Sequence, residues 1–240
     1  MARSGRLGLA LAGLMLPVVA ASAAPAEVIP PSALPYGLSY EEWSAKWWQF
    51  YYGQSTNHMD LLGSPDICEG PASRVRFLNG APATTSKTNH VTLFADTPLF
   101  FSILGIEADN TACPTTDFGT NSAEALAAAA VGAFSAATLT TCTVDGVAVP
   151  GLENPISTIY NVVSAPFSFT TAKEHNIVAV AEGEPCLPGE LTVYPAVADG
   201  VYLMLSPLSP GKHTIHFVGV AGPLSSPFLK LDITYDISVL

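Results

Sequence analysis

The segment LKLDITYDISV, residues 229–239, carries the clearest structural pattern in the chain, because apolar and polar residues alternate along it one by one. Successive side chains of a β-strand point to opposite faces, so this alternation predicts a strand with one buried face and one wet face. Such a strand belongs to a sheet that packs on a core with one side only. The buried face is predicted to hold Leu231, Ile233, Tyr235, Ile237 and Val239, and the wet face Asp232, Thr234, Asp236 and Ser238.

Eight segments upstream of residue 229 are also predicted to be strands, because they are rich in β-branched and aromatic residues. Asp145-Gly146 has the chemistry of a two-residue hairpin turn, Asp199-Gly200 is a second candidate turn, and Pro210-Gly211 suits a type II turn. Many short strands separated by turns predict a mainly β fold, an antiparallel β-sandwich of immunoglobulin-like or jelly-roll-like type. The eight segments are Arg74–Leu78, His90–Phe94, Leu99–Ile103, Leu139–Val144, Asn176–Val180, Leu191–Tyr194, Val201–Leu205 and His213–Val218.

Two accessory α-helices are expected beside the strands, and the first of them runs from Tyr40 to Tyr52. Ser39 and Glu42 form a capping box at its start, and Gly53 stands where a helix commonly ends. All three tryptophans of the chain lie in this helix. Its aromatic residues are too many to fit on one face, so we expect some rings to remain exposed.

The second helix is rich in alanine and is predicted from about Ser122 to Ser135. Asn121 and Glu124 supply its start signal, and alanine is the best helix former. No internal repeat divides the remaining sequence, so residues 39–240 are predicted to form a single β-sandwich domain with an N-terminal aromatic helix.

The N-terminus has the order of a secretory signal peptide. Arg3 and Arg6 precede an apolar stretch of about 14 residues, shorter than the roughly 20 that a membrane helix needs. Small residues follow, so cleavage is expected before Ala24, which makes residues 1–23 the signal peptide and residues 24–38 a flexible lead-in. No later segment is long and apolar enough to span a membrane. The mature protein is therefore expected to be secreted or periplasmic, with no membrane span.

The four cysteines of the chain remain after cleavage of the signal. An even number in an exported protein favours disulfides, although three pairings are open. We expect Cys113 to pair with Cys142, because these two residues bracket the second helix, and Cys68 to pair with Cys186. No Cys-x-x-Cys spacing is present, so a zinc site has no support.

The composition narrows the class of partner. The formal net charge is −11, so the chain lacks the basic patch that nucleic acids require. Only 12% of the residues are charged and 49% are hydrophobic, which excludes a disordered acidic tail.

Two stretches resemble a group of secreted bacterial proteins of unknown function. One is YGLSYEEWSAKWWQ, residues 36–49, and the other is PLSPGKHTIHF, residues 207–217. The likeness extends to VRFL at 75–78 and LFF at 99–101. The resemblance implies an exported β-sandwich and brings no activity with it.

No catalytic or metal-binding motif stands out. The chain contains neither Gly-x-Ser-x-Gly nor His-Glu-x-x-His. His213 and His216 are three apart on a predicted strand, so they point to opposite faces, and a histidine satisfied by a backbone carbonyl is the preferred interpretation of His213. Asp109, Asn110 and Asp117 around Cys113 could offer oxygen ligands to Ca²⁺, but solvated loop residues are the simpler interpretation. We therefore assign no catalytic residue, metal or cofactor.

The aromatic helix gives the best indication of function. We expect Trp43 and Trp47 to be buried, and Trp48 and Tyr52 to lie on another side of the helix. There they would either be covered by loops, or be exposed and bind a protein or carbohydrate surface or a second copy of the chain. The sequence thus predicts a secreted or periplasmic, non-catalytic binding or structural module. The alternative is a secreted carboxylate-dependent enzyme that acts on polysaccharide.

Overall fold

The computed structural model describes residues 26–56, 75–80, 84–111, 119–180 and 185–240. The predicted signal peptide at 1–23 lies outside the described residues, as do Cys68 and Cys113. Predictions that rest on those residues alone stay predictions.

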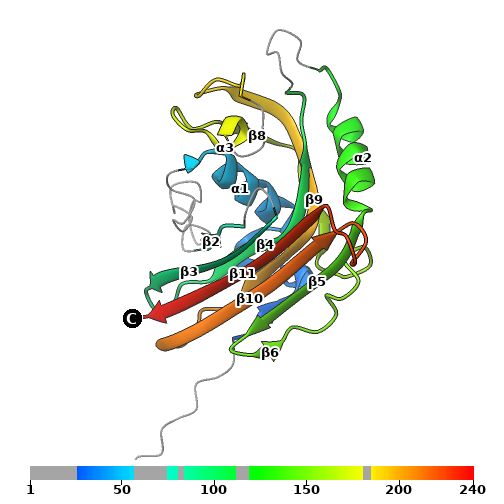
Figure 1. Ribbon diagram of the computed structural model, residues 1–240. Helices are drawn as coiled ribbons and strands as arrows, with labels where there is room; N and C mark the ends of the chain where they lie inside the picture. The colour runs from blue at the N-terminus through cyan, green and yellow to red at the C-terminus, as the bar shows by residue number, and fades with distance from the viewer. Residues whose placement is uncertain (1–25, 57–74, 81–83, 112–118, 181–184) are drawn as a thin grey trace, which may run out of the picture.

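Strands dominate the described residues and form two sheets that pack face to face (Figure 1). The first sheet has the strand order β1-β9-β4-β2, and β7 and β8 also pair with β9; its members are β1 (Val28–Ile29), β2 (Arg76–Leu78), β4 (Leu99–Ala108), β7 (Asn161–Val163), β8 (Phe167–Thr170) and β9 (Thr192–Leu205). The second sheet has the order β3-β11-β10-β5-β6, with members β3 (Thr85–Leu93), β5 (Ala137–Val144), β6 (Val147–Ala148), β10 (Gly211–Ala221) and β11 (Leu229–Val239). The predicted β-sandwich with accessory helices is confirmed.

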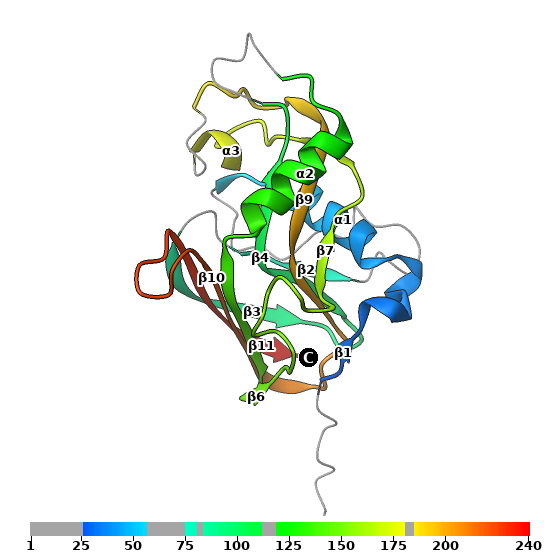
Figure 2. The same cartoon turned by 90° about the vertical axis from the view of Figure 1, so that its right-hand side faces the viewer.

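Three α-helices accompany the sheets in the described part of the chain. The helix α1 (Tyr40–Tyr52) lies on the face of the first sheet that points away from the second sheet (Figure 1). The helix α2 (Ala123–Phe134) lies alongside β9 (Figure 2) and buries the stripe Leu126, Ala130 and Phe134. The third, α3 (Ile177–Val180), is a single turn.

The central strands β4 and β9 are buried on both faces, because α1 covers one face and the second sheet covers the other. Phe100 and Tyr202 belong to the core beneath α1, where their rings stack with centroids 5.7 Å apart. Phe101 and Leu203, one residue further along each strand, belong to the core between the sheets. This double burial explains why β4 and β9 lack the regular alternation of apolar and polar residues that β11 shows as predicted.

The two sheets approach each other closely at Gly219 of β10, which lies against β4. A Cβ atom added at Gly219 would stand 2.6 Å from the carbonyl oxygen of Ile103 and 2.9 Å from the Cβ of Leu104. Only glycine fits at this position, because the obstructing atoms belong to the backbone and the base of a side chain.

The turn at Asp145-Gly146 is confirmed. Both residues have positive φ, 51° and 77°, as a type I′ hairpin turn requires, and they join β5 to β6. Not every neighbour is antiparallel: β2 pairs in parallel with β4, and β3 in parallel with β11. Both parallel strands lie at sheet edges.

Three local predictions are wrong. The Asp199-Gly200 pair lies inside the continuous strand β9, where Gly200 pairs with Gly105. The segment Asn176–Val180 is not a strand, because the Asn176 side chain accepts the Ala179 N–H at 2.8 Å and starts α3. The N-cap of α2 is Ser122 rather than Asn121.

Candidate functional site

The aromatic rings of α1 are all buried, which corrects the expectation that one side of the helix is exposed. Trp43 is fully buried, while Trp48 and Tyr52 are only 7% and 3% exposed. The first sheet curves around the helix, and α3 and β8 contact it as well, so rings on several sides of α1 find neighbours. Trp48 and Tyr52 therefore offer no exposed aromatic surface.

Each tryptophan indole N–H of α1 donates a hydrogen bond to a different partner. Trp43 Nε1 bonds to the carbonyl oxygen of Pro35, and Trp47 Nε1 bonds to that of Leu78, each at 2.9 Å. Trp48 Nε1 instead donates to the hydroxyl oxygen of Tyr202 at 2.8 Å. These bonds satisfy the buried polar atoms and fix the orientation of every indole ring.

Two glycines that face each other across β4 and β9 make room for the Trp48 ring. A Cβ atom at Gly105 would stand 3.2 Å from Trp48 Cζ2, and one at Gly200 would stand 3.0 Å from the Tyr202 hydroxyl. The missing side chains leave a shallow hollow in the sheet, which receives the edge of the indole and the tyrosine hydroxyl together.

An irregularity in β4 places an acidic residue on the same face. The pairing with β9 shifts between Ser102, opposite Tyr202, and Leu104, opposite Val201, so β4 carries one extra residue. Because side chains alternate along a strand, this bulge puts Glu107 on the α1 face together with Ser102. Without it, Glu107 would point toward the opposite face.

The Glu107 carboxylate accepts a hydrogen bond from the Tyr52 hydroxyl, with 2.9 Å between Tyr52 Oη and Glu107 Oε2. Burial raises the pKa of Tyr202, the Trp48 N–H lowers it, and the negative charges of Asp199 and Glu107 raise it further. Asp199 lies one residue from Gly200 and so belongs to the other face of β9, where Asn161 Nδ2 donates to its Oδ1 at 2.7 Å. Glu107 is thus the acidic group on the aromatic side.

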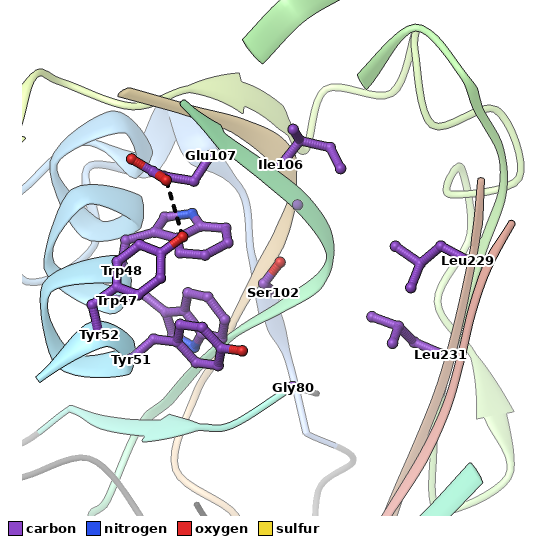
Figure 3. A pocket seen from close by; sticks show the side chains of 11 residues that line it. Trp47, Trp48, Tyr51, Tyr52, Gly80, Ser102, Ile106, Glu107, Leu229 and Leu231 are labelled. Carbon is purple, nitrogen blue, oxygen red and sulfur yellow. Dashed lines mark hydrogen bonds between the residues drawn. The ribbon is translucent and has the colours of Figure 1, made fainter. Parts of the chain in front are cut away.

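These residues surround a pocket of about 230 Å³ (Figure 3). The lining residues come from α1, from β4 and from the start of β11, and β4 lies between the other two elements. Figure 3 shows the rings and Glu107 on one side of β4, and Ile106, Leu229 and Leu231 on its other side. The described lining consists of Trp47, Trp48, Tyr51, Tyr52, Gly80, Ser102, Gly105, Ile106, Glu107, Leu229 and Leu231.

The other candidate residues from the sequence do not join this pocket. His213 and His216 do point to opposite faces, and His213 lies 2.8 Å from the Ser209 carbonyl oxygen, as expected of a satisfied histidine. His213 also bonds to Asp145 Oδ2 at 2.7 Å, a partner that the sequence did not indicate. The Asp109 carboxylate accepts hydrogen bonds from the backbone N–H and the hydroxyl of Thr111, so it stabilises its own loop. No group of three possible metal ligands occurs among the residues that the structure describes.

The predicted bridge between Cys113 and Cys142 is wrong, because Cys142 is a free, buried thiol. Cys142 lies on β5 within the core between the sheets, and burial raises its pKa to about 12. Cys186 is disulfide-bonded, and its partner lies outside the described residues. The pairing of Cys186 with Cys68 stays a prediction.

Comparison with protein-family models and with curated proteins finds no match for this chain. Among solved structures, the chain matches the solution structure of Amebosin at 10% identity, over 65% of this chain and 98% of that one, with a TM-score of 0.20. A likeness at that level carries no argument about fold or function. Among the described helices, none has the length and apolar character needed to cross a membrane.

Sequence reasoning missed Ser102, Gly105, Glu107 and Gly200 as parts of the site. A glycine inside a predicted strand often marks a close backbone approach, so Gly105 and Gly200 offered a usable signal. The bulge that orients Glu107 has no such signal in the sequence. The residue at the bulge, Ile103, is of a type that is common in regular strands.

Proposed function

We propose that this protein is a non-catalytic binding module whose ligand is a small molecule held in the pocket between α1, β4 and β11. The observation that carries the proposal is the lining itself. Four aromatic side chains, two leucines and a few polar groups surround one concave space. Ligand sites in proteins have this composition: mostly apolar walls with a small number of placed polar groups.

The size of the pocket limits the ligand. A volume of about 230 Å³ lies below the roughly 300–1,000 Å³ that is usual for drug-sized ligands. A single ring with a short chain suits it better than an oligosaccharide or a peptide. Trp48 and Tyr52, proposed from the sequence as binding residues, keep that role as pocket walls rather than as a surface.

The enzyme alternative has less support from this pocket. Glycoside hydrolysis by the usual route needs two carboxyl groups that flank one bond. The described lining contains one carboxylate, Glu107, while Asp199 is engaged by Asn161 on the other face of β9. Turnover of a polysaccharide or ester substrate that is abolished by Glu107→Gln would contradict the binding proposal.

The indole N–H signals of the three tryptophans provide a direct test. Trp47 and Trp48 line the pocket, whereas Trp43 bonds to Pro35 at the start of the helix and serves as an internal control. We expect small aromatic probes, added at millimolar concentration to the ¹⁵N-labelled protein, to shift the signals of Trp47 and Trp48 and leave that of Trp43 in place. Equal shifts of all three signals, or none, would contradict the proposal.

The secreted or periplasmic location is likewise a proposal, and it rests on the sequence of residues 1–23. Intact mass of the exported protein measures it directly: the chain should begin at Ala24. Retention of the first 23 residues in that form would contradict it.

A further inference from the structure

The pocket contains an open stretch of sheet edge. β4 pairs with β9 from Leu99 to Ala108, but β2 pairs with it only at Leu99–Phe101. Among the described strands, none pairs with β4 beyond Phe101 on the β2 side. Gly105 lies in this stretch, opposite Gly200 of β9, and it lines the pocket. Because glycine has no side chain, the atoms that Gly105 contributes to the lining belong to the backbone.

The hydrogen bonds of β9 show which way these backbone atoms point. The Ala198 N–H donates to Ser164 Oγ at 2.9 Å, and the Ala198 carbonyl oxygen accepts from the Ser164 N–H at 2.7 Å. Gly200, two residues further along β9, points the same way, toward Val162 of β7. In an antiparallel ladder, a residue opposite one that points outward points outward on its own strand. The Gly105 N–H and carbonyl therefore face away from β9.

These two backbone groups of Gly105 have no hydrogen-bond partner among the described residues. The free N–H and carbonyl of a strand edge are a template for one more extended chain. We infer that the ligand is an N-acylated amino acid with an aromatic side chain, which pairs with Gly105 as the residue of a further antiparallel strand does. In that orientation one residue makes both bonds with its own N–H and carbonyl. The inference rests on the proposed function of the pocket and names the class of ligand.

The pairing also fixes the direction of the ligand's side chain. Residues that lie opposite each other in a sheet direct their side chains to the same face. A Cβ atom at Gly105 would stand 3.2 Å from Trp48 Cζ2, so this face is the one that carries α1. The ligand's side chain therefore points toward the ring wall, where Trp47 and Tyr51 stack with centroids 5.3 Å apart. An aromatic side chain suits this wall, because aromatic pairs gain free energy beyond the area that they bury.

A second polar group on the same face is left without a protein partner. Ser102 is only 5% exposed and lines the pocket (Figure 3), and within the described part of the chain its hydroxyl makes no hydrogen bond. A Cβ atom at Gly105 would stand 3.1 Å from Ser102 Oγ, so this hydroxyl lies next to the open edge. Buried polar groups in proteins nearly always have a partner. Two neighbouring points of the lining thus have hydrogen-bonding capacity that a polar ligand can use.

Three probes of nearly equal size test the pairing. N-acetyl-L-phenylalanine dimethylamide has a single N–H, and it has a carbonyl on the same residue. In O-acetyl-L-phenyllactic acid dimethylamide an ester oxygen replaces that N–H. The D-enantiomer of the first probe keeps both groups but turns its ring to the other face of β4, where Ile106, Leu229 and Leu231 lie.

Each probe is titrated into the full mature ¹⁵N-labelled protein while the backbone N–H of Gly105 and the indole N–H of Trp47 and Trp48 are followed. We expect the L-amide to shift the Gly105 signal and to slow the exchange of that amide hydrogen with solvent. The backbone N–H of Gly200, which points toward β7, is the internal control and should not change. The ester should bind about fivefold more weakly, because one net hydrogen bond is worth roughly that factor. The D-enantiomer should lose a similar factor, because its ring leaves the aromatic wall.

The outcomes separate this inference from the proposal beneath it. If the probes shift the Trp47 and Trp48 signals but the ester binds as tightly as the L-amide, or the Gly105 signal and its exchange rate stay unchanged, the pocket is a binding site and the pairing is wrong. Equal affinity for the two enantiomers also overturns the inference. If simple aromatic probes shift the Trp47 and Trp48 signals and the L-amide does not, the ligand class is wrong and the proposed function stands. If none of these molecules shifts the signals at millimolar concentration, both fail.

Discussion

Replacing Gly219 by alanine tests the packing of the two sheets where β10 lies against β4. The new Cβ would stand 2.6 Å from the Ile103 carbonyl oxygen and 2.9 Å from the Leu104 Cβ. Carbon atoms pack at about 3.5–4.0 Å, and none of these atoms can rotate away, so the sheets must separate by roughly 1 Å. Strain of this kind in a well-packed core costs about 1–3 kcal/mol.

Urea denaturation of the wild type and the variant measures the change in the free energy of unfolding. In a domain of this size, each kcal/mol of lost stability lowers Tm by roughly 2–4 °C. The matched control is Gly132→Ala. Gly132 lies in α2, nothing stands within 4 Å of an added Cβ, and alanine should stabilise the helix by about 0.5–1 kcal/mol. The packing argument would be refuted if Gly219→Ala were as stable as the wild type or moved in the same direction as Gly132→Ala.

Other predictions follow from burial and from hydrogen bonds. Trp48→Ala should destabilise the protein by about 3–5 kcal/mol in the same denaturation assay, because the indole is buried and hydrogen-bonded. An unchanged Tm would contradict the burial of Trp48. Burial lowers the pKa of His213, but the hydrogen bond to Asp145 and a backbone carbonyl raise it above the ordinary value overall. The protonated histidine therefore adds stability that is fully present below about pH 6.5 and is lost as the pH rises through the higher folded-state pKa. Wild type should lose more stability between about pH 5.5 and 8.5 than His213→Gln does, and equal slopes would contradict this. Cys142 should resist maleimide in the native protein at neutral pH and react once the chain is denatured without reductant, whereas rapid labelling of the native protein would place the thiol outside the core.

The local signals of the sequence were sufficient for the helix α1. Ser39 and Glu42 make the predicted capping box, and the helix runs from Tyr40 to Tyr52 as expected. The capping residues interact within a few positions of one another, so their effect does not depend on how the rest of the chain folds. The strand β11 was equally readable, because its alternation reflects one buried and one wet face.

The environment of the α1 rings could not be read in the same way. Trp48 is buried because Gly105 and Gly200 lie opposite each other on strands far apart in the sequence, and that pairing is a property of the assembled sheet. The position of Glu107 depends on a single extra residue in β4, and a one-residue change of register moves every later side chain to the other face. The pairing register of strands that are distant in the sequence therefore could not be predicted, and the pocket depends on that register.

The place of β11 in the second sheet has a consequence for how the chain reaches its folded state. β11 (Leu229–Val239) lies between β3 and β10. Among the described strands, β3 pairs only with β11, so β3 is held in the sheet by residues made more than a hundred positions later. During synthesis β3 therefore cannot take its place in the sheet until β11 has left the ribosome, and contacts of such long range make this assembly slow. Loss of residues from β11 would leave β3 without its partner along the corresponding part of its length.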